Sequence, residues 1–96
     1  MSYLDKLQSV ADADVIQLLS KDKEYGGSWK QRGGVGAFMM TARKWDRVET
    51  QLMAHGYDIF QAIEADPVGF LDDVGDLRRY LMLIEAEMID RGIVGG

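Results

Sequence analysis

Residues 66–92 read DPVGFLDDVGDLRRYLMLIEAEMIDRG, and this stretch is the strongest indication of the fold class. Asp66 stands at an N-cap position, Pro67 lies in the first turn, and Gly92 comes just past the expected end. The apolar residues recur every three or four positions, which is the spacing of one face of an α-helix: Phe70, Val74, Leu77, Leu81, Ile84 and Met88. The stretch therefore predicts a long helix from residue 67 to about residue 91.

The same spacing predicts three earlier helices, at roughly residues 2–20, 36–54 and 58–65. Ser2 and Asp58 are expected to cap the first and the third, and His55-Gly56 is a stop signal for the second. The expected inward-facing residues are Leu4, Leu7, Ala11, Val15, Leu18 and Leu19, then Phe38, Ala42, Trp45 and Leu52, then Ile59, Phe60 and Ile63. Residues 1–96 thus predict a single all-α domain, a four-helix bundle-like fold with a glycine-rich loop between its first two helices.

The composition limits the classes of function. The chain has 96 residues, no cysteine and no apolar run close to the roughly 18 residues that a membrane span needs. Small secreted domains usually carry disulfides, so we expect a cytoplasmic location and no membrane partner. The net charge of −5 argues against general nucleic-acid binding. Hydrophobic residues make up 47% of the chain, and we expect part of this surface to meet another copy in a homodimer or higher oligomer.

Charge is divided unevenly along the chain. Residues 21–47 hold seven Lys or Arg against three acids, a balance of 7 − 3 = +4, and residues 48–96 hold three against ten, or 3 − 10 = −7. A basic region and an acidic region of this kind are suited to a phosphate and a divalent cation, respectively.

Two pairs of carboxylates fall on or beside the expected apolar arcs. Glu49 and Asp73 lie inside the arcs of the second and fourth helices, and Asp46 and Asp76 lie on their edges. Each pair is spaced i, i+3, so both acids occupy one helix face. Inward carboxylates repel one another without a cation, and oxygen ligands suit Mg²⁺ or Mn²⁺. The alternative is a solvated helix face on which the acids pair with neighbouring cations, namely Arg43, Lys44, Arg47, Arg78 and Arg79.

The stretch EYGGSWKQRGGVG, residues 24–36, is the second candidate for a site. Backbone N–H groups of glycine-rich turns bind anions, Lys30 and Arg32 carry charge for a phosphate, and Trp29 or Tyr25 offers a ring for a base. The alternative is a flexible connector whose tryptophan packs on the core.

Three motifs resemble known families. The segment LDDVGDLRRYL, residues 71–81, resembles the acidic helix of MazG-like all-α nucleoside triphosphate pyrophosphohydrolases, and RKWDRVE, residues 43–49, resembles the helix before it. The segment KDKEYGGSW, residues 21–29, is similar to the opening of nucleotide modification associated domain proteins of phages and bacteria. The resemblance implies a location in a bacterium or a phage-infected host cell. It also implies that the metal ligands are Asp46, Glu49, Asp73 and Asp76, although aspartate replaces the usual glutamate at the first and third of these positions.

Three functions remain open at this point. The leading hypothesis is a magnesium-dependent nucleotide-binding domain that hydrolyses a (deoxy)nucleoside triphosphate to monophosphate and pyrophosphate, with Glu49 and Asp73 as catalytic residues. The second is a non-catalytic phage-type protein that binds or sequesters a nucleotide signal, a hypothesis that the short chain and the aspartate replacements favour. The third is a helical interaction module without a ligand.

Overall fold

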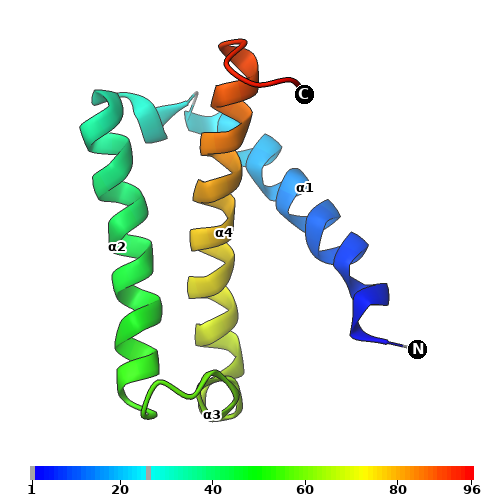
Figure 1. The fold of residues 1–96 in the computed structure, drawn as a ribbon, viewed down its shortest axis with the longest axis vertical. Helices are drawn as coiled ribbons and strands as arrows, with labels where there is room; N and C mark the ends of the chain where they lie inside the picture. Colours follow the sequence, from blue (N-terminus) through cyan, green and yellow to red (C-terminus); the bar gives the residue numbers. More distant parts are fainter. Residues whose placement is uncertain (1, 26) are drawn as a thin grey trace.

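The computed structural model describes residues 2–25 and 27–96, except for the side chains of residues 23–25. The elements in order are the 3-10 helix η1 (Tyr3–Lys6), α1 (Leu7–Tyr25), the 3-10 helix η2 (Ser28–Lys30), α2 (Gly33–Met53), α3 (Ile59–Ala65) and α4 (Pro67–Asp90). The described residues contain no strand, which confirms the all-α, bundle-like prediction (Figure 1). The last three α-helices match their predicted ranges to within three residues. The first runs to Tyr25 instead of residue 20.

The predicted helix caps are confirmed. The Ser2 side chain accepts a hydrogen bond from the Leu4 backbone N–H at 3.1 Å. Asp58 accepts from two backbone N–H groups of α3, and Asp66 accepts from Gly69 with Pro67 in the first turn of α4. Because these caps satisfy backbone donors that a helix start leaves free, short-range chemistry is enough to place the helix starts.

The glycine-rich connection is shorter than predicted because both flanking helices extend into it. Gly27 has φ 71° and Gly33 has φ 77°, the left-handed region in which glycine carries no steric penalty. Gly34 and Gly36 lie inside the first turn of α2. In this connection Gly27 and Gly33 therefore change the direction of the chain, and the short helix η2 lies between them.

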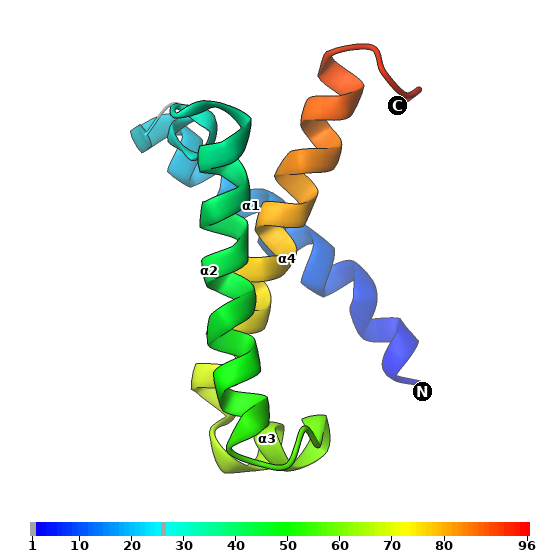
Figure 2. The same cartoon turned by 60° about the vertical axis from the view of Figure 1, so that its left-hand side comes forward.

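The core lies between α2, α3 and the first half of α4. Its buried residues are Val48, Leu52, Ala62 and Phe70, with Val74 and Leu77 packed against them. Helices α2 and α4 run side by side, and α3 covers one end of the pair (Figures 1 and 2). Helix α1 crosses the pair near its own C-terminal end, and its N-terminal end points away. Most of the hydrophobic core therefore comes from the part of the chain after residue 36.

The predicted inward face of α2 was wrong in its rotation. The buried residues are Ala37, Val48 and Leu52, whereas Phe38 and Trp45 are exposed. The true face is rotated by about 70° from the predicted one, which is less than the 100° step between successive residues.

Helices α1 and α3 also differ from the predicted packing. Ile59, Phe60 and Ile63 of α3 are exposed, and the small Ala62 is its buried contact. In the apolar stripe of the N-terminal helix, Leu4, Leu7, Val15 and Leu19 are exposed because α1 leaves the bundle. The predicted stripe of α4 is buried at Phe70 and exposed from Leu81 onward.

Candidate functional site

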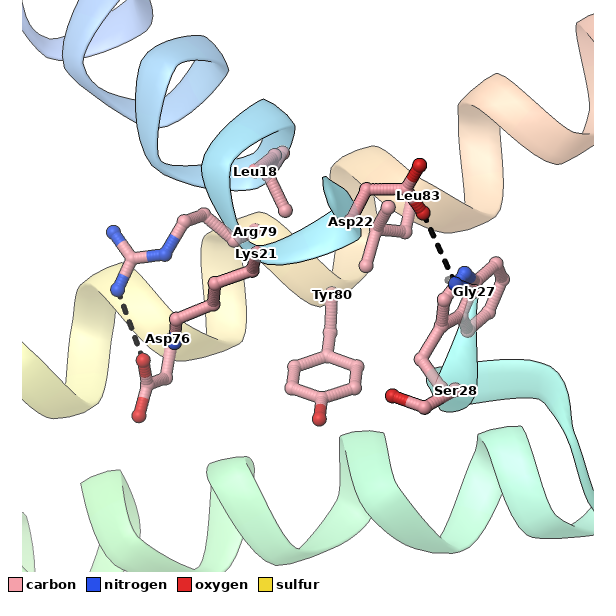
Figure 3. A pocket seen from close by; sticks show the side chains of 10 residues that line it. Leu18, Lys21, Asp22, Gly27, Ser28, Asp76, Arg79, Tyr80 and Leu83 are labelled. Atoms are coloured by element: carbon pink, nitrogen blue, oxygen red, sulfur yellow. Dashed lines mark hydrogen bonds and ion pairs between the residues drawn. The ribbon is translucent and has the colours of Figure 1, made fainter. Parts of the chain in front are cut away.

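A pocket of about 300 Å³ opens where α1, the Gly27–Lys30 turn and α4 meet (Figure 3). It combines two aromatic rings, two cations, two carboxylates and a small apolar wall. Its lining residues are Leu18, Lys21, Asp22, Gly27, Ser28, Trp29, Asp76, Arg79, Tyr80 and Leu83. The volume lies at the small end of the range of ligand pockets, which is about 300–1,000 Å³.

Asp22 holds the turn that forms one wall of the pocket. Its Oδ1 accepts a hydrogen bond from the Gly27 backbone N–H at 3.0 Å (Figure 3). Gly27 adopts a left-handed conformation at this point, and the following residues wind into η2. The carboxylate thus fixes the position of Ser28 and Trp29 relative to the end of α1.

Asp14 joins α1 to α4 and is the one charged side chain among the described residues that is buried. Only 1% of its side chain is exposed, and it accepts hydrogen bonds from Arg78 Nε at 2.5 Å, Arg78 Nη2 at 2.9 Å and Arg79 Nη1 at 3.1 Å. The hydrogen bonds from Arg78 lower the pKa of Asp14 more than its burial raises it, and Arg79 adds to the effect. Asp14 is therefore a buried carboxylate that stays ionised because two guanidinium groups compensate it.

Arg79 extends this network to the pocket and to α2. Its Nη2 donates to Asp76 Oδ1 at 2.9 Å, and Lys44 Nζ lies 3.4 Å from Asp76 Oδ2. Burial tends to raise the pKa of Asp76, but the hydrogen bond from Arg79 and the charge of Lys44 outweigh it, so the pKa is lowered. A Cβ atom at Gly75 would lie only 2.9 Å from Arg79 Nη1, so a glycine in the middle of α4 leaves the space that this guanidinium occupies.

Tyr80 places a phenol ring on the wall between Asp76 and the Gly27 turn (Figure 3). Burial and the charge of Asp76 raise its pKa, and Lys44 Nζ lies 6.0 Å from the ring centroid. The phenol group is therefore uncharged at neutral pH, and the Lys44 ammonium faces the ring from α2.

The four predicted metal ligands are not brought together. Asp46 is exposed, and Glu49 is partly buried on the next turn of α2. Asp73 accepts a hydrogen bond from Gln51 Nε2 in an open groove that Asp76 also lines, and Asp76 is paired with Arg79 and Lys44. Among the described side chains, those of residues 2–22 and 27–96, no three His, Cys, Asp or Glu form a group that is able to hold a metal ion.

The rotation of α2 explains this result, since it moves Asp46 to about 160° from the core direction. In this arrangement the four acids do not fit a carboxylate-ligated Mg²⁺ or Mn²⁺, because the two from α4, Asp73 and Asp76, already accept from an amide and from a cation, respectively. For Asp76 the alternative of an acid paired with neighbouring cations is confirmed by the structure.

The predicted nucleotide-binding residues are split between two places. Trp29 is partly buried and lines the pocket. Lys30 forms an ion pair with Glu87 at 2.5 Å on the far side of η2, and Arg32 is exposed at the start of α2, outside the pocket lining. The side chain of Tyr25 lies outside the described residues.

Asp14, Lys21 and Tyr80 were not predicted as pocket or network residues, and Arg79 was predicted only as an alternative partner of the helix acids. Asp14 carried a usable signal, since it lies at the edge of the apolar stripe of the first helix, beside Leu7 and Leu18, where an acid that becomes buried needs a partner. The glycine at position 75, in the middle of a long helix, was a second signal of close approach. No comparable pattern marks Lys21 or Tyr80, because their role depends on how α1 crosses α4.

Comparisons with protein families, with characterised proteins and with solved structures give no match for this chain. None of the helices in the described part of the chain combines the length and the apolar character that crossing a bilayer requires.

Proposed function

We propose that the chain binds a nucleoside phosphate in the pocket between α1, η2 and α4, and that binding rather than hydrolysis is its function. The observation that carries the proposal is the placement of Trp29, Tyr80 and Lys21 around one pocket of about 300 Å³. A planar base, a sugar and a charged phosphate need these three kinds of contact.

The base is expected on the aromatic side of the pocket. Trp29 comes from η2 and Tyr80 from α4, and Leu18 and Leu83 complete the apolar wall. Stacking of a base on an aromatic side chain contributes about 1–3 kcal/mol, and it tolerates different bases. Asp22 and Ser28 at the rim supply polar atoms for hydrogen bonds to the base or the sugar.

The phosphate is expected at Lys21. Arg79 also lines the pocket, but it already donates to Asp14 and Asp76, so its remaining capacity is limited. Lys21 is exposed on the last turns of α1 and reaches the pocket as a flexible point charge. This arrangement suits a ligand with its phosphate toward solvent and its base inside.

Magnesium-dependent pyrophosphate release from a (deoxy)nucleoside triphosphate is the second candidate. Asp72, Asp73 and Asp76 all line one open groove beside α4, which is the observation in its favour. It requires Asp76 to leave Arg79 and Lys44, and Asp73 to leave Gln51. The binding proposal needs no such rearrangement, and for this reason we rank it first.

Isothermal titration calorimetry tests the binding proposal. The purified chain is titrated with nucleoside mono- and triphosphates in the absence of metal. We expect Lys21→Gln to weaken the phosphate-dependent part of the affinity about 10- to 100-fold, because a charge-assisted hydrogen bond contributes about 1.5–3 kcal/mol. The matched control is Lys6→Gln, which removes a lysine from η1, outside the pocket lining. Equal losses in both variants, or no binding of any nucleotide by the wild type, would overturn the proposal.

The hydrolytic candidate is tested in the same samples by adding magnesium and measuring pyrophosphate release. Turnover that is lost in Asp73→Asn would favour the enzyme. Binding of intact nucleotide with no pyrophosphate would favour the binder.

A further inference from the structure

The single chain exposes far more surface than a compact protein of its mass. Its accessible area is 7,359 Å², whereas a folded monomer of 10.8 kDa is expected to expose about 5,500 Å². Its radius of gyration is 15.1 Å, compared with about 12.5 Å for a compact domain of this length. The excess area is thus about 1,800 Å² per chain.

Part of this excess lies on one face of the α2–α4 pair. On α2, Phe38 and Trp45 lie about 60–80° from the buried direction of that helix. On α4, Leu81 lies at about the same rotation as the buried Phe70, so the apolar stripe continues past the part that α3 covers. Helix α3 covers the half of this face that lies near the C-terminal end of α2 and the N-terminal end of α4, where Ala62 packs with Leu52 and Phe70.

The other half of the face, near the N-terminal end of α2 and the C-terminal end of α4, is bordered by Trp29 and Lys30 of η2 and by Ile93, but it keeps large apolar residues exposed. Phe38 is 66% exposed, Trp45 46%, Leu81 51%, and Ile84 and Met88 36% each. We call these five residues the open face. An apolar groove of about 410 Å³ runs between Phe38 on α2 and Ile84 and Met88 on α4, so the open face offers both protruding rings and a recess.

We propose that a second copy of this chain covers the open face in a two-fold symmetric dimer. An interface of ordinary size buries about 800 Å² on each partner, and an obligate homodimer buries about 1,000–2,500 Å² on each partner. The excess of about 1,800 Å² per chain is larger than the first figure and lies within the second range, and the splayed N-terminal half of α1 accounts for part of this excess. A two-fold axis brings the same patch of both copies together, so the rings of one copy meet the groove of the other.

The dimer proposal does not rest on the nucleotide proposal, although Trp29 lines both the pocket and the apolar groove. On α4 the pocket takes Asp76, Arg79, Tyr80 and Leu83, and the open face takes Leu81, Ile84 and Met88. These two sets lie on different sides of the helix, and Phe38 does not line the pocket, so a substitution at Phe38 tests the open face alone.

Light scattering coupled to gel filtration tests the proposal on the full chain. We expect the wild type to have twice the chain mass of 10.8 kDa and Phe38→Glu to shift toward the single-chain mass. The matched control is Met39→Glu, an exposed neighbour that lies on another side of α2 and is expected to remain dimeric. A monomeric wild type, or equal behaviour of the two variants, overturns the proposal.

Loss of folding in Phe38→Glu would not obscure the answer, because the wild type is tested separately. The melting temperature of a dimer rises with protein concentration, whereas that of a monomer does not. We expect a rise for the wild type, and a constant melting temperature refutes the dimer. Anionic vesicles serve as the probe for another occupant of the open face. If the wild type is monomeric and binds these vesicles in a way that requires Phe38 but not Met39, the face is assigned to a lipid surface instead.

Discussion

Replacing Asp14 with asparagine tests whether the buried charge network holds α1 in place. Asp14→Asn preserves the shape of the side chain and removes the charge that faces Arg78 and Arg79. Helix α1 makes few other contacts with α4, and most of its large apolar residues are exposed. The docking of α1 therefore depends strongly on this one carboxylate.

The magnitude follows from the exposure of the three partners. Removing one partner of a fully buried ion pair costs about 3–5 kcal/mol, because the other charge is left without compensation. Here the Asp14 side chain is 1% exposed, but those of Arg79 and Arg78 are 14% and 35% exposed, so water reaches the guanidinium groups. The asparagine amide still accepts one hydrogen bond, and we expect a loss of about 2–3 kcal/mol.

Such a loss is a large share of the free energy of unfolding, which is about 5–14 kcal/mol for a domain of this length. It corresponds to a fall in melting temperature of about 10–20 °C, measured by circular dichroism at fixed protein concentration. The control is Asp12→Asn, which changes an exposed acid two positions earlier whose described contact is with Gln8. A fall of less than about 3 °C in Asp14→Asn, or an equal fall in the control, would refute the role of the network.

Three further predictions concern pH, a glycine and a cap. The pKa of Asp14 is lowered in the folded state, so the stability that its negative charge contributes is complete well above the unfolded pKa of 3.8. This stability is lost as the pH falls below 3.8 and passes the folded pKa. Urea titrations should therefore show a smaller loss of stability over this pH range for Asp14→Asn than for the wild type. Gly75→Ala should lower stability by about 1–2 kcal/mol despite the better helix propensity of alanine, because its Cβ displaces Arg79, and urea titration of the double variant should show that this loss is not additive with that of Asp14→Asn. Asp58→Ala removes the cap of α3 and should cost about 1 kcal/mol, seen as a fall of about 4–8 °C in melting temperature and absent if the cap is unimportant.

The starts of η1, α3 and α4 were predictable from sequence because each depends on residues within one turn. The start of α2 at Gly33 has no side-chain cap, and the predicted start lay three residues later. Ser2, Asp58 and Asp66 accept from N–H groups two or three positions ahead, so a short window contains all the chemistry. The position of α1 was not predictable in this way. It depends on contacts between Asp14 and residues 64 and 65 positions later, and no local pattern encodes which arginine meets a given acid.

The rotation of α2 was mispredicted for a different reason. Hydrophobic periodicity reports the sum of all the surfaces that a helix buries, including those against another chain. The predicted face of Phe38, Ala42, Trp45 and Leu52 and the core face around Val48 lie about 70° apart on the same helix. A helix that packs against α4 on one side and against a second copy on the neighbouring side would show a periodicity centred between its two contacts and pulled toward its largest rings. The mismatch between the apolar pattern of α2 and its burial in a single chain is then an expected property of a helix at an interface, and it gives Phe38 and Trp45 a reason to be apolar that the isolated chain does not provide.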